Sequence, residues 1–236
     1  MKILGVKIDS LSFQEAVRYA DILIRNKKSS YIVTLNPEII MAATNDNELK
    51  RIINRADLVT PDGFGLMLAA RFLGTPLKER ITGVDLTWAL IKLAEDRGYS
   101  VFLLGGAPGV AKKAVQNILR VHPKVKFVGI SSADPDDKDI INTIGKAKPH
   151  ILFVAYGAPK QEKFIYQLKN RVNIPLSMGV GGTFDYIAGV QPFAPRWIRK
   201  AGLEWLYRLF TQPKRLNRIL TATIRFPWAV LRSKFK

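Results

Sequence analysis

Short apolar runs alternate with helix-like segments through the first 195 residues of this chain. The runs are rich in β-branched and aromatic residues, which is typical of strands buried on both faces. The segments between them carry apolar residues at helical spacing. Strands that alternate with helices form βαβ units, so we predict a three-layer, Rossmann-like α/β domain with a mostly parallel sheet. The expected strands are 30–35, 100–104, 126–130 and 151–156, and the expected helices are 13–25, 86–96, 111–121 and 160–170.

Polar residues that follow the expected strands are the first candidates for a site, because ligands of open parallel sheets bind at the carboxyl ends of the strands. Thr34 and Asn36 end the first strand, beside a helix that we expect to begin at Pro37. Free N–H groups at such a helix start attract anions. Capping and turn formation are the alternative role for both residues. We also expect Ser12 and Asp85 to cap helices.

Two further candidates are charged residues next to glycines. Asp62 follows an apolar pair at 58–59 in a glycine-bounded loop, where a carboxylate can act as a general base toward a sugar hydroxyl. An Asx-turn or a helix cap is the alternative. Arg80 offers forked donors that suit a diphosphate. An ion pair with Glu79 or Asp85 is the competing interpretation for this guanidinium.

Three glycine-rich strand ends predict contacts to a nucleotide. Gly105 and Gly106 follow a strand and precede a helix, where a backbone can approach phosphates closely. Their spacing matches neither the dinucleotide-binding nor the P-loop pattern, which argues against a dehydrogenase or a P-loop nucleotide hydrolase. An acid after the last strand can accept a hydrogen bond from ribose or uracil. The candidates at the other two strand ends are Tyr156, Gly157, Lys160, Gln161, Glu162, Gly181 and Asp185.

A metal site is not expected. Asp134 and Asp136 form a D-x-D pattern of the kind that holds a divalent metal in many sugar-nucleotide transferases, but they directly precede an apolar helical pattern. Acids are common in the first turn of a helix, and we favour that capping role. His122 and His150 lack the spacing of metal ligands. The chain has no cysteine, which excludes thiolate ligands and disulfides.

Residues 196–236 differ from the rest and are predicted to form a basic helical appendage to the 1–195 domain. They hold eleven Lys or Arg against one acid, Glu204, in a chain whose net charge is +18. Three of the four tryptophans also lie there. Leu216, Ile219, Leu220, Thr223 and Ile224 share one face of a helix that Pro213 should start and Pro227 should end or kink.

Such a basic amphipathic helix favours contact with an anionic membrane surface. Packing of its apolar face on the main domain, or a solvated basic tail, are the alternatives. A nucleic-acid-binding protein would carry its aromatic and basic residues interleaved on a sheet or groove, which this tail does not do. A non-catalytic nucleotide- or lipid-sensing module is the other rival. The N-terminus has no signal-peptide pattern and no apolar run is long enough to span a bilayer, so we expect a cytoplasmic protein.

Taken together, the ordered motifs over residues 1–195 resemble one family, the WecG/TagA/CpsF glycosyltransferases. The tail is similar to the appendage found in some of its members. The motifs that carry the resemblance are Thr34-Leu35-Asn36, Pro61-Asp62-Gly63, Arg80-Ile81-Thr82-Gly83-Val84-Asp85, Leu104-Gly105-Gly106, Gly157-Ala158-Pro159-Lys160-Gln161-Glu162 and Gly179-Val180-Gly181-Gly182-Thr183-Phe184-Asp185.

The resemblance implies an activity and a location. It implies inverting, metal-independent transfer of N-acetylmannosamine from a UDP donor to N-acetylglucosamine on a polyprenyl diphosphate, a step in wall teichoic acid synthesis. Related members use N-acetylmannosaminuronic acid or capsule sugars instead. No cofactor is implied beyond the UDP-sugar donor. The expected location is peripheral, on the inner face of the plasma membrane, with a homo-oligomer forming away from it and no nucleic-acid partner.

The resemblance also implies roles for individual residues. Asp62 would be the catalytic base, Thr34 would hold the sugar and Asp185 would contact the nucleotide. Gln161 and Arg80 would line the active site. Three arginines of the appendage would close over that site at the membrane, namely Arg208, Arg215 and Arg218.

Overall fold

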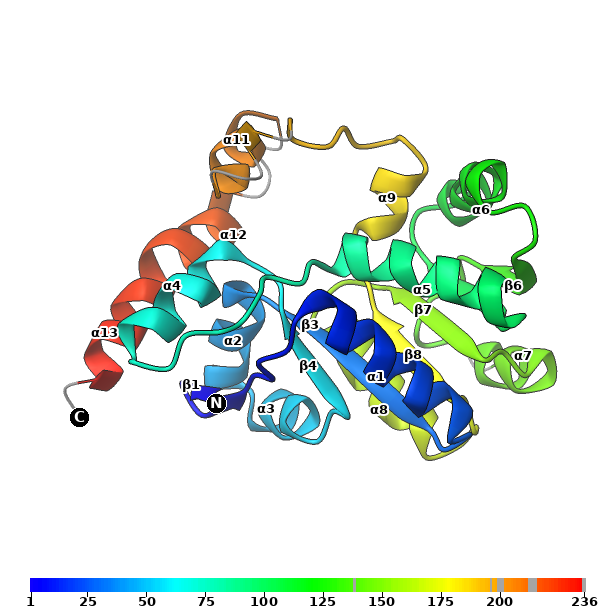
Figure 1. Cartoon of the computed structure of the whole chain (residues 1–236), viewed down its shortest axis with the longest axis horizontal. Helices are drawn as coiled ribbons and strands as arrows, with labels where there is room; N and C mark the ends of the chain where they lie inside the picture. The colour runs from blue at the N-terminus through cyan, green and yellow to red at the C-terminus, as the bar shows by residue number, and fades with distance from the viewer. Residues whose placement is uncertain (138, 196, 199–201, 212–215, 235–236) are drawn as a thin grey trace.

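The computed structural model describes residues 1–137, 139–195, 197–198, 202–211 and 216–234 (Figure 1). Six strands form a wholly parallel sheet in the order β4-β3-β8-β7-β5-β6, which confirms the predicted α/β class. A two-stranded antiparallel hairpin precedes it, formed by β1 (Lys2–Ile3) and β2 (Val6–Lys7). The sheet strands are β3 (Ser30–Leu35), β4 (Leu58–Pro61), β5 (Ser100–Gly105), β6 (Lys126–Ser131), β7 (Ile151–Ala155) and β8 (Leu176–Gly179).

Helices cover both faces of this sheet, as expected for three layers (Figure 1). One face packs against α2 (Pro37–Asn45), α3 (Asn47–Asn54), α4 (Phe64–Phe72), α7 (Ile140–Ala147) and α8 (Lys160–Lys169). The other packs against α1 (Phe13–Arg25), α5 (Gly83–Arg97), α6 (Val110–Val121) and α9 (Thr183–Ile187). Side chains alternate along each strand, so Phe102 of β5 joins the first core and its neighbours Val101 and Leu103 join the second. The near-continuous apolar strands of the sequence follow from this double burial.

One predicted helix cap is confirmed and one is wrong. Ser12 caps α1 in a reciprocal capping box with Glu15. The cap of α5 is Thr82, whose hydroxyl accepts from the Asp85 N–H at 3.1 Å, and Asp85 is the third residue of the helix. The helix begins at Gly83, three residues before the predicted start, because the Thr82 hydroxyl caps it there.

The tail continues as helices through the expected break at Pro227. Its described parts are α11 (Glu204–Thr211), α12 (Leu216–Leu220), a π-helical turn (Thr221–Arg225) and α13 (Phe226–Lys234). The wider π-turn makes room for the proline ring, which would clash with a carbonyl four residues earlier in an α-helix. Pro213 lies outside the described residues. No helix in the described part of the chain is both long and apolar enough to cross a bilayer.

The tail shares the core of the main domain. Phe226 is 0% and Val230 is 2% exposed, and both belong to the core that also contains Ile40 and Leu66. Figure 1 shows α13 beside α4 at one end of the molecule, where it also contacts α2. The predicted apolar face is therefore divided, since Ile219 is buried whereas Ile224 is 60% exposed. The hydrophobic core thus draws side chains from both sides of the 195/196 boundary.

Truncation of Phe226 should destabilise the whole protein. Phe226→Ala removes a fully buried ring and should lower the free energy of unfolding by about 3–5 kcal/mol. The neighbouring Trp228 is 60% exposed, so Trp228→Ala should change it by about 0.5 kcal/mol or less. Urea denaturation followed by circular dichroism measures both. Equal stability of the two variants would show that the tail does not contribute to the core.

Candidate active site

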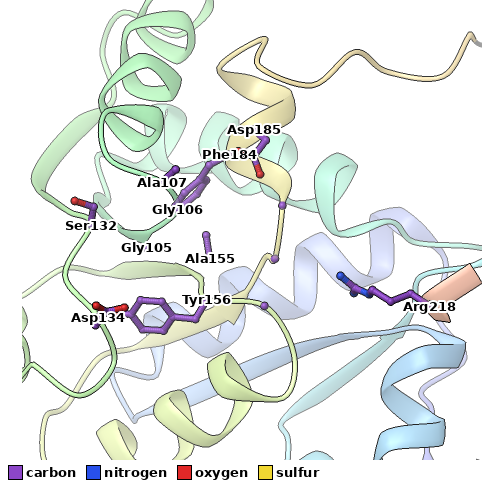
Figure 2. A pocket seen from close by; sticks show the side chains of 13 residues that line it. Gly105, Gly106, Ala107, Ser132, Asp134, Ala155, Tyr156, Phe184, Asp185 and Arg218 are labelled. Atoms are coloured by element: carbon purple, nitrogen blue, oxygen red, sulfur yellow. The ribbon is translucent and has the colours of Figure 1, made fainter. Parts of the chain in front are cut away.

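Three adjoining hollows follow the carboxyl edge of the sheet. The first, the outer cavity, has a volume of about 400 Å³ and lies over the ends of β5, β7 and β8 (Figure 2). The second, the central cavity, measures about 140 Å³ and shares Gly157, Gly181, Gly182 and Arg218 with the first. The third, the α4 groove, measures about 370 Å³ and shares Asn36, Glu38 and Asp62 with the second. The shared residues make the three hollows one continuous surface.

Glycines shape the floor of the outer cavity. Gly105 has a φ of +91°, and a Cβ atom there would lie 3.0 Å from the Ala155 backbone, so only glycine fits this close approach of two loops. Tyr156 forms one wall and donates from its hydroxyl to the Ala133 carbonyl at 2.7 Å. Burial raises the pKa of Tyr156, which keeps it a donor at neutral pH. Figure 2 shows Phe184 and Asp185 of α9 on the far side of the same cavity.

The central cavity brings together seven of the predicted residues, among them Thr34, Asn36 and Asp62. Thr34 is buried at the end of β3 and donates to the Gly179 carbonyl at 3.2 Å. Asp62 is half-buried, and its Oδ2 accepts the Gly83 N–H at 2.8 Å. This bond means that Asp62 does not cap α4, which has Gly63 at its N-cap without a side-chain bond. Asn36 does cap α2, through Ile39 N–H at 2.9 Å, and still lines the cavity.

Gln161 ties two loops of this edge together. Its Oε1 accepts from the backbone N–H of Gly157 at 3.1 Å and of Gly181 at 3.0 Å. Its Nε2 donates to Glu162 Oε1 at 2.8 Å. A Cβ on Gly179 would lie 2.6 Å from this nitrogen, so the glycine leaves the space that the amide fills. The bond to Glu162 fixes which end of the amide faces the two loops.

Glu162 lies behind Gln161 and cannot touch a ligand directly. It is 2% exposed, and its Oε2 is buried with no hydrogen-bond partner among the described residues. Burial raises the pKa of this carboxyl to about 7. Lys160, the third member of the predicted trio, is exposed and lines none of the three hollows. Of the three, Gln161 alone faces the site.

Two predicted arginines reach the site, each paired with a carboxylate. Arg80 lies 3.3 Å from Glu204 of α11, and not beside Glu79 or Asp85 as its competing interpretation assumed. Arg218 of α12 donates to Glu38 of α2 and lines both the outer and the central cavity. Figure 2 shows Arg218 reaching from the tail toward the outer cavity.

The other two arginines predicted for the site are Arg208 and Arg215. Arg208 belongs to α11, but its side chain is outside the described part of the structure, as is the whole of Arg215. The sequence did not predict the carboxylate partners of Arg80 and Arg218, which are Glu204 and Glu38. Glu204 is the sole acid among the last 41 residues, a signal that pointed to a specific role.

The acids of the D-x-D segment do not cap α7 as predicted. The helix begins at Ile140, Asp139 is its N-cap without a side-chain bond, and Asp137 accepts from the Asp139 N–H. Asp134 instead lines the outer cavity, whereas Asp136 is exposed. Among the described residues, no three acidic, histidine or cysteine side chains come together as a metal site.

Ionisation of Glu162 should cost stability. Because its pKa is raised from 4.5 to about 7, the folded protein holds this proton more tightly than the unfolded chain. Its contribution is complete below about pH 4.5 and falls by roughly 3 kcal/mol as pH rises through 7. Glu162→Gln should therefore lose stability less steeply than wild type between pH 5 and 7.5. Urea unfolding at a series of pH values tests this, with Asp136→Asn as the exposed-carboxyl control; a slope unchanged in Glu162→Gln would contradict it.

The sequence of the chain matches a known family and named relatives. The model of the glycosyl transferase WecG/TagA/CpsF family matches residues 1–236. A Staphylococcus aureus (strain NCTC 8325) protein is 32% identical over 99% of this chain and 93% of its own length. A Bacillus subtilis (strain 168) protein is 34% identical over 84% of this chain and 78% of its own. Both are named N-acetylglucosaminyldiphosphoundecaprenol N-acetyl-beta-D-mannosaminyltransferase. The chain described here belongs to the WecG/TagA/CpsF glycosyltransferase family.

Proposed function

We propose that this chain transfers N-acetylmannosamine from UDP-N-acetylmannosamine to N-acetylglucosamine on a polyprenyl diphosphate, building the linkage unit of wall teichoic acid. The observation that carries the proposal is the position of Asp62, between a glycine-lined cavity on one side and an apolar groove on the other. The names of the Staphylococcus and Bacillus relatives specify that sugar and that lipid acceptor. A related transferase with another UDP-sugar, such as N-acetylmannosaminuronic acid, is the alternative.

The outer cavity is our proposed site for the UDP part of the donor. Asp185 would accept from ribose or uracil there, while the glycine loops at 105–106 and 181–182 offer their backbone at close range. The sugar would then enter the central cavity beside Thr34, whose hydroxyl is at the end of β3. Gln161 supports this arrangement because it holds the loops of both cavities at a fixed separation.

The proposed chemistry is a direct displacement at the anomeric carbon of the donor sugar. Asp62 takes the proton from an acceptor hydroxyl, and the freed oxygen attacks that carbon. The bond between the carbon and the diphosphate breaks on the side opposite to the attacking oxygen. The configuration therefore inverts, and UDP leaves. The N–H bond from Gly83 holds one carboxylate oxygen of Asp62 in place. The other oxygen is the one that we assign to the proton.

An arginine is proposed to neutralise the departing diphosphate without a metal. We assign this role to Arg218, which lines the two cavities between which the diphosphate would lie, whereas Arg80 lines the adjoining groove. Each is held by a carboxylate in the free protein, so a doubly charged phosphate group would compete with Glu38 or Glu204 for the guanidinium. Such preorganised cations stabilise charge that develops in the transition state.

The tail is proposed to bring the enzyme to the inner face of the plasma membrane, where a lipid acceptor resides. Its basic residues suit an anionic surface, at roughly 1 kcal/mol each. Ile224 and Trp228 are each 60% exposed and add apolar groups that can enter the interface. The buried residues Phe226 and Val230 anchor this surface to the catalytic domain.

Removing the base should abolish most turnover and leave donor binding intact. Asp62→Asn keeps an oxygen that can accept from Gly83 but loses proton affinity, so the rate of UDP release should fall about a hundredfold or more. Calorimetry should give an unchanged UDP affinity. Asp96→Asn, an exposed acid paired with Lys92, is the matched control and should retain full activity. Turnover by Asp62→Asn within a few-fold of wild type would remove Asp62 from the base role.

Metal chelation should have almost no effect on the initial rate. The reasoning is that Arg218 supplies the positive charge that a divalent metal gives to other sugar-nucleotide transferases. UDP release measured in excess EDTA and in added Mg²⁺ or Mn²⁺ should agree. Loss of activity in EDTA, with recovery on adding metal, would direct attention to Asp134 in the outer cavity.

Arg218 should matter more for turnover than for membrane binding. Arg218→Ala and Arg232→Ala each remove one positive charge from the tail. Binding to anionic vesicles, measured by sedimentation, should therefore weaken equally and modestly in both variants, by roughly 1 kcal/mol. Of these two residues, Arg218 lines the outer and central cavities and Arg232 does not. UDP release should therefore fall about a hundredfold in Arg218→Ala and stay unchanged in Arg232→Ala. If both variants lose turnover in proportion to binding, Arg218 is an anchor without a part in the chemistry.

A further inference from the structure

The α4 groove changes character along its length. At the end shared with the central cavity its lining is polar, with Asn36, Glu38 and Asp62. The rest of the groove is lined mainly by apolar groups from α4 and from the tail. These include Phe64 and Leu68 of α4, Trp205 of α11, Ile219 of α12, and Pro227 of α13. The sugar and diphosphate groups of a sugar-nucleotide are mainly polar, so they would gain little from contact with such apolar walls.

The α4 side of the groove continues outward as a row of exposed apolar side chains. Phe64, Leu68 and Phe72 lie at i, i+4 and i+8 on α4, and they are 43%, 54% and 42% exposed. The opposite face of the same helix is buried through Leu66, Ala69 and Ala70. Helix α4 is therefore apolar on two sides, although its core packing needs only one. An exposed row of this kind marks a surface that binds an apolar partner.

We infer that the α4 groove binds the first isoprenoid units of the acceptor lipid, with the diphosphate of that lipid next to Arg80. The inference rests on the proposed function and adds to it where the lipid lies. An acceptor of this class carries its groups in a fixed order: sugar hydroxyl, sugar ring, diphosphate, hydrocarbon. The groove offers a carboxylate at one end, a guanidinium on its wall and apolar side chains over the remainder.

The tail supplies half of this groove, which links lipid binding to the position of the tail. The π-helical turn contacts α2 and α13 contacts α4, so the groove is the seam between the tail and the main domain. Glu204 of α11 holds Arg80 at 3.3 Å across the seam. A lipid diphosphate that bound Arg80 would displace this carboxylate and would take its place in joining the two parts.

Binding can be measured without catalysis. The probe is farnesyl diphosphate, added without vesicles below its aggregation concentration and followed by calorimetry; inorganic diphosphate is the stemless comparison. Leu68→Gln should weaken farnesyl diphosphate binding about tenfold, because it removes an apolar wall, and should leave inorganic diphosphate unchanged. Ile22→Gln is the matched control, since Ile22 is 45% exposed on α1, on the other face of the sheet. It should alter neither affinity.

Three results would overturn the inference. The first is that wild-type protein binds farnesyl diphosphate no better than inorganic diphosphate, and the second is that Leu68→Gln binds both as wild type does. The third is that Leu68→Gln changes only the sedimentation coefficient, which would show that a second copy of the chain covers the groove. Turnover provides the separate arm: acceptors with a farnesyl stem should have a lower KM than acceptors with a methyl stem, and Leu68→Gln should remove that difference. Failure of both acceptors to release UDP would refute the proposed function, while the binding data would still decide the groove.

Discussion

Parallel pairing of β3, β8 and β7 is the constraint on which the site depends. Val33 of β3 and Val154 of β7 both lie in register with Gly179 of β8, so the three strands end together. Because parallel strands all point the same way, the loops that follow them meet at one edge although long stretches of sequence separate them. The addition of β4 beside β3 brings Asp62 to the same edge.

The loops at this edge are joined by the buried amide of Gln161. Gln161 accepts from Gly157 and Gly181 with one oxygen, which costs little because both donors are backbone groups that need partners. Its nitrogen donates to Glu162, whose other oxygen has no partner in the part of the chain that the structure describes. An unpaired buried polar atom is unfavourable for folding. Its retention behind the site is consistent with a need to fix the orientation of Gln161.

The tail has two physical roles that a simple appendage would not combine. Phe226 and Val230 complete the core below α2 and α4, while Arg218 and Trp205 project toward the three hollows. Fixing the tail through the core places Arg218 in the same cavity as Asp62. The same packing creates the α4 groove, since one of its walls belongs to the tail. A basic surface, a core element and a wall of the site thus come from one segment of fewer than fifty residues.

The sequence alone was enough to predict most helices and strands and the edge of the sheet at which the candidate site lies. The bounds of β3 and α1 were predicted to the residue, because β-branched runs and an amphipathic pattern with the Ser12 cap are local signals. Asp62 and Gln161 were candidates from their place at strand ends, and the resemblance assigned their roles and added Arg218. Local signals do not encode partners, however, and for this reason Asp85 was taken for a cap and Glu204 was not foreseen as the partner of Arg80.

Which of the predicted site residues lie together, and what surrounds each of them, depends on the tertiary structure. Lys160 and Gln161 are adjacent in sequence, yet one faces solvent and the other joins two loops, because neighbouring residues of a helix point in different directions. The apolar face of the tail was visible in its periodicity, but periodicity does not say what covers a face. Burial of Phe226 and exposure of Leu68 depend on how α13 packs beside α4, and that is settled by contacts between residues about 160 positions apart.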